Sequence, residues 1–173
     1  MFRFRALGSL LLLAPLLAAS ALPSLAQAGG AEELGARIAE AYEAGRCTQV
    51  VTLATQLERV GPEAVDGITH YRWGYCAARL DRGDPVAHYE QAAERLAEAV
   101  AAGGAGLEQH FYRVNSLINL GRSEAAVEAA RAAIESWQAG GFTVDEDSPT
   151  AWFRLGKLFR NGQPRYDKGA EQQ

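Results

Sequence analysis

The sequence predicts an all-α protein, a helical-repeat solenoid of about three and a half antiparallel helix pairs. Alanine, the residue with the highest helix propensity, supplies 33 of the 173 residues. Gly45, Gly83 and Gly121 follow one another at intervals of 38 residues, and each separates two stretches with helical apolar periodicity. A repeat of this length, with a glycine between two helical stretches, is typical of stacked helix–turn–helix units.

The first 28 residues are predicted to be a cleaved signal peptide rather than part of the fold. Arg3 and Arg5 precede an apolar stretch over residues 7–22, and Ala26 and Ala28 supply the small residues of a cleavage site. Cleavage leaves residues 29–173 and places the protein in the periplasm or outside the cell. A retained membrane anchor is the open alternative. After residue 28 no run approaches the roughly 20 apolar residues that span a bilayer.

The remaining chain divides into units at about 31–62, 66–102 and 107–140 and a partial unit at 148–173. The first helix of a unit has a large residue, then an apolar, a small and a large residue at spacings of three, one and three, and a glycine three residues later. This spacing places the side chains on one face of a helix. The pattern occurs as Trp73, Cys76, Ala77, Leu80, Gly83; as Phe111, Val114, Asn115, Ile118, Gly121; and as Trp152, Leu155, Gly156, Phe159, Gly162, with a shorter version at Ile38, Ala39, Tyr42, Gly45.

A second amphipathic helix is predicted after each of the first three glycines. The apolar positions are Val50, Ala54, Leu57, Val60; Tyr89, Ala93, Leu96, Val100; and Val127, Ala130, Ile134, Trp137. Asp84-Pro85 and Ser148-Pro149 each place a capping side chain before a proline suited to the first helical position. Ser123 is predicted to cap the helix that follows Gly121.

These patterns resemble the tetratricopeptide repeat family. The run Trp152-x-x-Leu155-Gly156-x-x-Phe159 is similar to that family's first helix, and Pro62 to its closing proline; its small second-helix positions match Ala126, Ala130 and Ala133. The resemblance covers about residues 31–163, with Asn115 and Gly35 as departures. It implies a right-handed superhelix whose first helices line a concave groove that binds peptides or protein segments.

The aromatic residues Trp73, Phe111 and Trp152 are predicted to pack in the core, with the next face of each first helix lining the groove. That groove would run from acidic to basic along the chain, and Lys157 and Arg160 would hold a carboxylate or an acidic segment. A merely solvated helix face is the alternative. Because Phe153 adjoins Trp152, one of the two is expected to be exposed. The predicted partner-binding residues are Tyr71, Arg82, Tyr112, Asn119, Phe153, Lys157 and Arg160.

Cys47 and Cys76 are the only cysteines. In an exported protein they can form a disulfide, whereas buried free thiols are the alternative. A disulfide requires Cα atoms within about 7 Å. By closing the loop between the two cysteines, it would stabilise the folded state by roughly 3–4 kcal/mol. The two residues lie at different heights along their predicted helices, so the sequence leaves both readings open.

No catalytic, cofactor-binding or metal-binding function is predicted. The sequence lacks the zinc-protease, serine-hydrolase, phosphate-loop and dinucleotide motifs. His70, His88 and His110 belong to different predicted helices, which gives no reason to expect a metal site, and His88 is expected to be exposed. The formal net charge of −4 disfavours nucleic-acid binding.

The leading functional hypothesis is an exported scaffold of the cell envelope that binds a segment of another protein in the concave groove. The alternative is a structural or assembly subunit that self-associates through the uncapped C-terminal unit. A third hypothesis gives the two cysteines a thiol-based or metal-handling role.

Overall fold

The computed structural model describes residues 25–163, which form helices joined by short loops and contain no strand. The helices of this part of the chain are α1 (Leu25–Glu43), α2 (Cys47–Val60), the 3-10 turn η1 (Pro62–Ala64), α3 (Gly67–Leu80), α4 (Pro85–Ala101), α5 (Leu107–Asn119), α6 (Ser123–Gln138) and α7 (Pro149–Gly162). The all-α prediction is therefore confirmed for the described residues.

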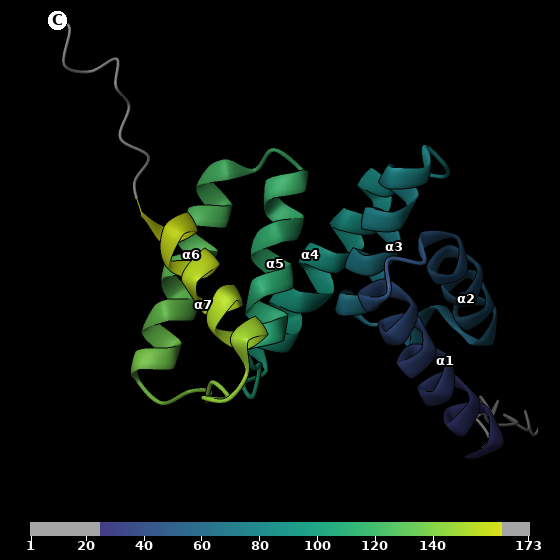
Figure 1. Cartoon of the computed structure of the whole chain (residues 1–173), viewed down its shortest axis with the longest axis horizontal. Coiled ribbons are helices and arrows are strands. Elements are labelled where there is room, and N and C mark those ends of the chain that lie inside the picture. Colours follow the sequence, from purple (N-terminus) through teal and green to yellow (C-terminus); the bar gives the residue numbers. More distant parts are fainter. Residues whose placement is uncertain (1–24, 164–173) are drawn as a thin grey trace, which may run out of the picture.

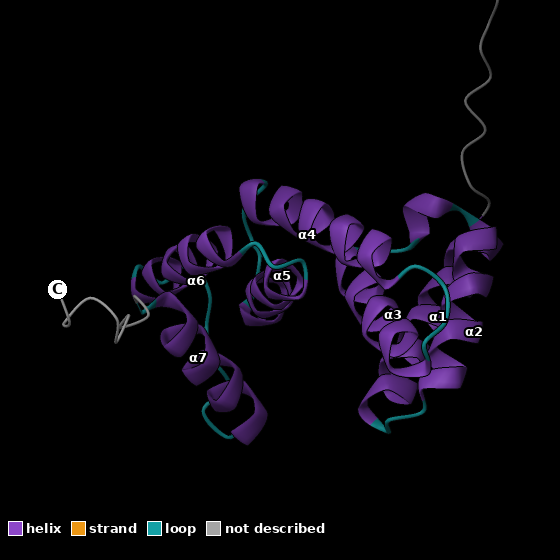
Figure 2. Ribbon diagram, turned by 90° about the horizontal axis from the view of Figure 1, so that it is seen from above, coloured by secondary structure: helices purple, strands orange, loops and turns teal. Residues whose placement is uncertain are grey.

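The helices pack in the order of the chain. Every helix from α1 to α6 contacts the next α-helix, and α1, α3, α5 and α7 also contact one another in succession. Figure 1 shows α1 and α2 at one end of the molecule and α6 and α7 at the other, while α4 connects the two halves in Figure 2. The odd-numbered helices thus form an inner row, and α2, α4 and α6 lie on its outer side.

Glycine follows the ends of α1 and α5 as predicted, whereas α3 ends at Asp81, which takes the left-handed conformation with a φ of 51° two residues before Gly83. Gly45, Gly83 and Gly121 have φ angles of 69°, 71° and 70°, in the left-handed region that favours glycine. Gly162 differs, since it is the buried last residue of α7 rather than a turn residue. A Cβ on Gly162 would lie 3.3 Å from Cδ1 of Ile134, so this glycine allows α7 to approach α6 closely.

Two of the three predicted N-caps are present. Asp84 Oδ1 accepts a hydrogen bond of 3.0 Å from the backbone N–H of Ala87, and Ser148 Oγ accepts one of 3.2 Å from that of Ala151. The prediction for Ser123 is wrong by one position: Arg122 is the N-cap and caps without a side-chain hydrogen bond. These local contacts fix where α4 and α7 begin.

The core consists of three consecutive clusters. The first joins α1, α2 and α3, the second joins α3, α4 and α5, and the third joins α5, α6 and α7. Their central buried residues are Ile38, Leu57 and Trp73 in the first, Tyr71, Leu96 and Tyr112 in the second, and Val114, Ala130 and Leu158 in the third. Each helix therefore depends mainly on its neighbours in the sequence for burial.

The predicted signal peptide lies outside the described residues except for its last four positions. Residues 25–28 form the first turn of α1. Among the described helices, none is both long and apolar enough to cross a bilayer. Residues 164–173 of the predicted final unit also lie outside the described part.

Candidate interaction site

Tyr71 and Tyr112, predicted to line the groove, are instead buried. Their side chains belong to residues that are 7% and 2% exposed, and their ring centroids lie 4.6 Å apart between α3 and α5. Burial raises the pKa of both phenols above the ordinary value and keeps them neutral. The prediction failed because adjacent odd helices pack together and bury the side chains between them.

Four charged residues link all four odd helices over these rings. Nη2 of Arg72 on α3 donates to Oε1 of Glu108 on α5 at 3.1 Å, and Nη1 of Arg154 on α7 lies 3.4 Å from the same oxygen. Nη2 of Arg154 lies 3.7 Å from Oε1 of Glu43 on α1. We call Arg72, Glu108, Arg154 and Glu43 the inner-face network.

Aromatic rings pack against the two guanidinium groups of the inner-face network. The Arg72 guanidinium carbon lies 5.7 Å from the Tyr42 ring centroid and 5.6 Å from that of Tyr112. That of Arg154 lies 5.5 Å from the Tyr112 centroid and 5.7 Å from that of Phe111. Such contacts favour a cation over a ring face. The charged and aromatic side chains between the odd helices are thus engaged with one another.

Arg72 and Arg154 were difficult to identify as site residues from the sequence alone. Arg72 precedes Trp73, whereas Arg154 follows Trp152 by two residues, so the repeat alignment places the two arginines at different positions. A weak indication was present, since each arginine lies beside an aromatic residue of a predicted first helix. Only the approach of α3, α5 and α7 brings them to one carboxylate.

Phe153, Lys157 and Arg160 all lie on α7. Phe153 is 60% exposed, Arg160 is exposed, and Nζ of Lys157 lies 5.5 Å from the Phe153 ring centroid. Trp152, predicted to be in the core, is 46% exposed, so both members of the Trp152–Phe153 pair face solvent rather than one. The reason is that, within the described residues, no helix follows α7 to cover it.

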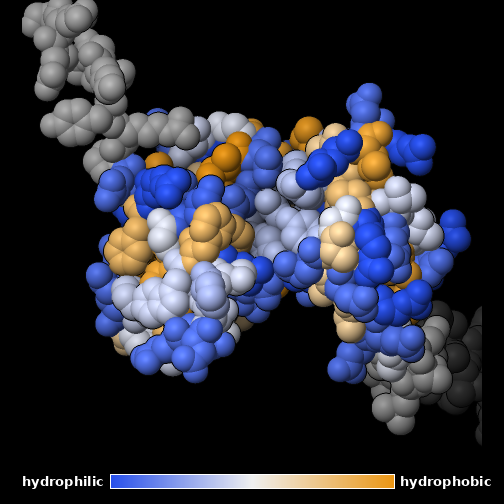
Figure 3. All heavy atoms as spheres, viewed as in Figure 1, coloured by the Kyte–Doolittle hydropathy of each residue, from blue (hydrophilic) through white to orange (hydrophobic). Residues whose placement is uncertain are grey.

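The exposed residues of α7 form one continuous side of the helix. At 100° per residue, Trp152, Phe153, Gly156, Phe159 and Arg160 fall within about a third of the circumference, and all are exposed. Leu155 and Leu158 lie outside this third of the circumference and are buried. We call the exposed five residues the α7 stripe; in Figure 3 the lobe of α6 and α7 carries apolar atoms among hydrophilic ones.

Two local contacts hold the ends of the α7 stripe. Nε1 of Trp152 donates to the backbone oxygen of Glu146 at 3.1 Å, which orients the indole. The Phe159 ring meets Trp137 of α6 edge to face, with centroids 5.9 Å apart. The stripe is therefore positioned on a helix whose other side is anchored in the core.

Arg82 lies two residues beyond the carboxyl end of α3, and Asn119 is the last residue of α5. Both are exposed. Nδ2 of Asn119 donates to the backbone oxygen of Asn115 at 2.9 Å, within its own helix. In the described part of the chain, no side-chain hydrogen bond or ion pair joins either residue to the inner-face network or the α7 stripe. The predicted partner-binding residues therefore do not form one continuous site.

The two cysteines are joined. Cys47 is the first residue of α2, Cys76 lies in α3, and their Cα atoms are 4.8 Å apart with the sulfur atoms bonded. The expected mismatch in height does not arise, because the start of α2 lies beside the middle of α3. The bond ties α2 to α3 in the N-terminal half of the described chain.

His70 and His88 come together, against the expectation from their separation in sequence. Their ring centroids lie 5.7 Å apart, and the His88 ring stacks on Trp73 at 4.0 Å, so His88 is half-buried rather than exposed. Burial, with Arg95 and His88 nearby, lowers the pKa of His70 to about 4. Within the described residues, no three potential ligands are arranged to hold a metal ion.

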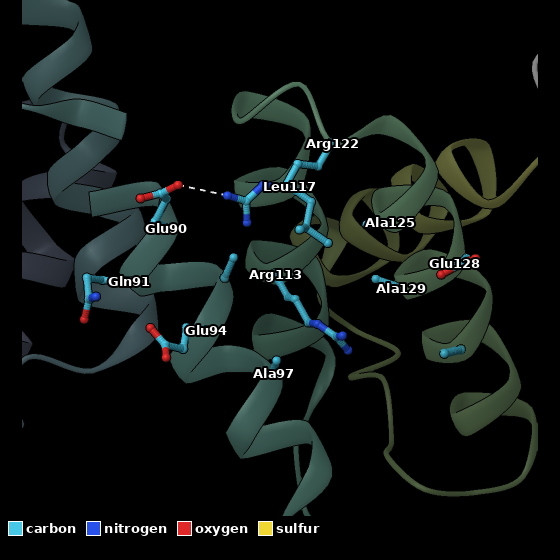
Figure 4. A pocket seen from close by; sticks show the side chains of 12 residues that line it. Glu90, Gln91, Glu94, Ala97, Arg113, Leu117, Arg122, Ala125, Glu128 and Ala129 are labelled. Atoms are coloured by element: carbon cyan, nitrogen blue, oxygen red, sulfur yellow. Dashed lines mark hydrogen bonds and ion pairs between the residues drawn. The ribbon is translucent and has the colours of Figure 1, made fainter. Parts of the chain in front are cut away.

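A second open surface lies on the outer side, between α4 and α6. This cavity of about 600 Å³ has Arg113 and Leu117 of α5 at its floor. Figure 4 shows Glu90 of α4 paired across it with Arg122, at 2.8 Å. Alanines of α4 and α6 line much of the rest of this cavity. Because their side chains are small, they offer a partner less apolar surface than the aromatic residues of the α7 stripe do.

Comparison of the chain with protein-family models, with curated proteins and with solved structures gave no match. The function must therefore be inferred from the surfaces described above.

Proposed function

We propose that this protein is an exported scaffold of the cell envelope that binds another protein, and that its helix pairs are tetratricopeptide-like repeats. The α7 stripe carries the proposal. Exposed apolar side chains gathered on one helix face are uncommon on monomeric proteins and mark surfaces that bind other macromolecules. Trp152, Phe153 and Phe159 gather in this way.

The pattern of contacts between successive helices supports the interpretation as repeats. Each helix packs on its neighbours, and the odd helices also contact one another, as expected of helix pairs stacked in sequence. The binding surface differs from the one expected from the sequence. Because the inner-face network pairs the charged side chains between the odd helices with one another, we assign the partner segment to α7, next to Lys157 and Arg160.

Export rests on the sequence of residues 1–28 and agrees with the Cys47–Cys76 disulfide. Disulfides persist in oxidising compartments such as the periplasm and are rare in the cytosol. The two observations are independent, since one concerns a leader sequence and the other the pairing of two core helices.

Self-association is the second candidate function. It is favoured by the order of the α7 stripe, in which Trp152 and Phe159 lie on either side of Gly156. Two antiparallel copies of α7 crossing at Gly156 would place Trp152 of each against Phe159 of the other, as a two-fold contact requires. A mass that rises with protein concentration would support this function, and a monomer at high concentration would exclude it.

Site-specific photo-crosslinking tests the leading function. A photoreactive amino acid replaces Phe153, and as a control it replaces Val86 of α4, which is 54% exposed and isolated. Irradiation of cells that export the protein should give one discrete crosslinked protein from position 153 and none from position 86. Absence of a crosslink at 153, or equal crosslinking at both positions, would contradict the proposal.

A further inference from the structure

We propose that the α7 stripe receives an amphipathic α-helix of a partner protein, one that carries carboxylates beside its apolar side. This inference rests on the proposed function and names the kind of segment that is bound. The partner helix would pack on α7 as α2, α4 and α6 pack on the odd helices that precede them.

The position of the partner helix follows from the contacts of the other odd helices. α1, α3 and α5 each pack against the even helix that follows, whereas no helix in the described part of the chain follows α7. Trp73 on α3 shows the consequence, because the His88 ring of α4 stacks on it at 4.0 Å. Trp152, the equivalent residue in the repeat pattern, is 46% exposed.

Gly156 marks where a second helix can approach. Gly156 is exposed and lies near the middle of the α7 stripe. A Cβ on Gly156 would have nothing within 4 Å. A gap between large side chains is what a ridge of another helix fills. Trp152 and Phe159 flank the gap and would supply the apolar contact.

The charge of α7 selects the chemistry of the partner. Arg154, Lys157 and Arg160 are its charged residues, and its sequence contains no Asp or Glu. The whole chain has a formal net charge of −4, so this helix is a basic element of an acidic protein. Lys157 and Arg160 border the apolar residues, where carboxylates of a bound helix would meet them.

The same charges disfavour a second copy as the occupant. Two α7 helices in contact would bring four cations, Lys157 and Arg160 of each copy, and no carboxylate of α7 into one interface, because Arg154 belongs to the inner-face network. Like charges across an interface oppose association, most strongly at low salt. A partner with carboxylates removes this repulsion while using the same Trp152 and Phe159 contacts.

Residues 123–138 of this chain supply a probe of the required chemistry. As a synthetic peptide they carry the amphipathic sequence of α6, with three glutamates and one arginine. Fluorescence anisotropy of the labelled peptide with the full protein should give a Kd in the range of about 10–1,000 μM. Tryptophan is enriched among the few residues that carry most of the binding energy of an interface. Trp152→Ala should therefore weaken binding by at least about tenfold, with Val86→Ala as the matched control.

Reversing the charges of the peptide and of the protein distinguishes recognition of carboxylates from binding through apolar contacts alone. A peptide with the three glutamates replaced by lysine should bind the native protein at least about fivefold more weakly, since like-charge contacts replace opposite ones. It should recover affinity for the Lys157→Glu/Arg160→Glu variant. No binding of the acidic peptide, or equal binding of both peptides, would overturn the inference. So would a dimer blocked by Trp152→Ala.

Failure of the peptide experiments would not refute the proposed function, which the crosslinking experiment tests separately. A crosslinked partner at position 153 would still be obtained if the bound segment were extended or basic. A missing crosslink at 153 combined with peptide binding would instead reject the cellular function and keep the chemistry of the stripe.

Discussion

Arg154 on α7 and Arg72 on α3 share one carboxylate oxygen, Oε1 of Glu108, at 3.4 and 3.1 Å. Both arginines are largely buried, and they belong to helices separated by α5. Glu108 therefore neutralises two cations that the packing of the odd helices forces together. Its side chain is about a third exposed, which moderates the energy of both pairs.

Glu108→Gln should destabilise the protein by about 1–2 kcal/mol, because two partly buried guanidinium groups lose their shared charge partner. Chemical denaturation monitored by circular dichroism measures the change. Glu40→Gln is the control, since Glu40 pairs with Arg46 on the exposed surface. That substitution should cost less than about 1 kcal/mol. Equal effects of the two substitutions would show that the inner-face network contributes nothing particular.

The disulfide should stabilise the fold by about 3 kcal/mol, since it closes a loop of 29 residues between α2 and α3. We expect reduction, or the double substitution Cys47→Ala/Cys76→Ala, to lower the midpoint of denaturation. Thiol titration gives the direct check: no reactive thiol before reduction and two after it. Two reactive thiols in the purified oxidised protein would contradict the pairing.

Acid should destabilise the protein through His70. Its pKa in the folded protein is about 4, below the ordinary value of 6.5, so the unfolded chain binds the proton first as the pH falls. Stability is therefore fully present above about pH 6.5 and decreases toward pH 4, by about 2 kcal/mol for this residue. Burial also lowers the pKa of His88 and His110, which adds loss in the same direction.

Urea denaturation of the native protein and of His70→Gln between pH 7.5 and 4.5 measures this contribution. The variant should lose less stability across that interval than the native protein, whatever its stability at pH 7.5. Parallel curves for the two proteins would show that His70 keeps an ordinary pKa.

Two glycine substitutions should have opposite effects. Gly121→Ala places a Cβ at φ 70°, a strained conformation for alanine, and should cost about 1 kcal/mol. Gly156→Ala lies inside α7 with nothing within 4 Å of the added methyl group, and helix propensity should raise stability by about 0.5–1 kcal/mol. Thermal denaturation compares them. A destabilising Gly156→Ala would mean that another group already packs there.

The helix ends were predictable because their signals are local. Gly121 ends α5 through its own left-handed backbone angle, and Asp84 begins α4 through its side chain, without help from distant residues. The miss at Gly162 has a physical cause of a different kind. Gly162 allows α7 to pack closely on α6, and the periodicity of the sequence does not reveal contacts between separate helices.

The burial of the aromatic residues could be predicted only in part. The spacing of Trp73 and Trp152 identifies the apolar face of each first helix, but not whether a neighbour covers that face. His88 covers Trp73, and no described residue does the same for Trp152. Tyr112 shows the opposite error, since the residue assigned to an open groove lies under Arg72 and Arg154.

Affinity capture with the native protein and with Trp152→Ala/Phe153→Ser tests most directly whether α7 binds a partner. Bound proteins from an envelope extract are quantified by mass spectrometry, with Val86→Ser as the control and circular dichroism to verify folding. We predict one stoichiometric partner with the native protein and the control, and its loss with the double variant. Retention of that partner by the folded double variant, or no partner with any of the three proteins, would contradict a binding function for α7.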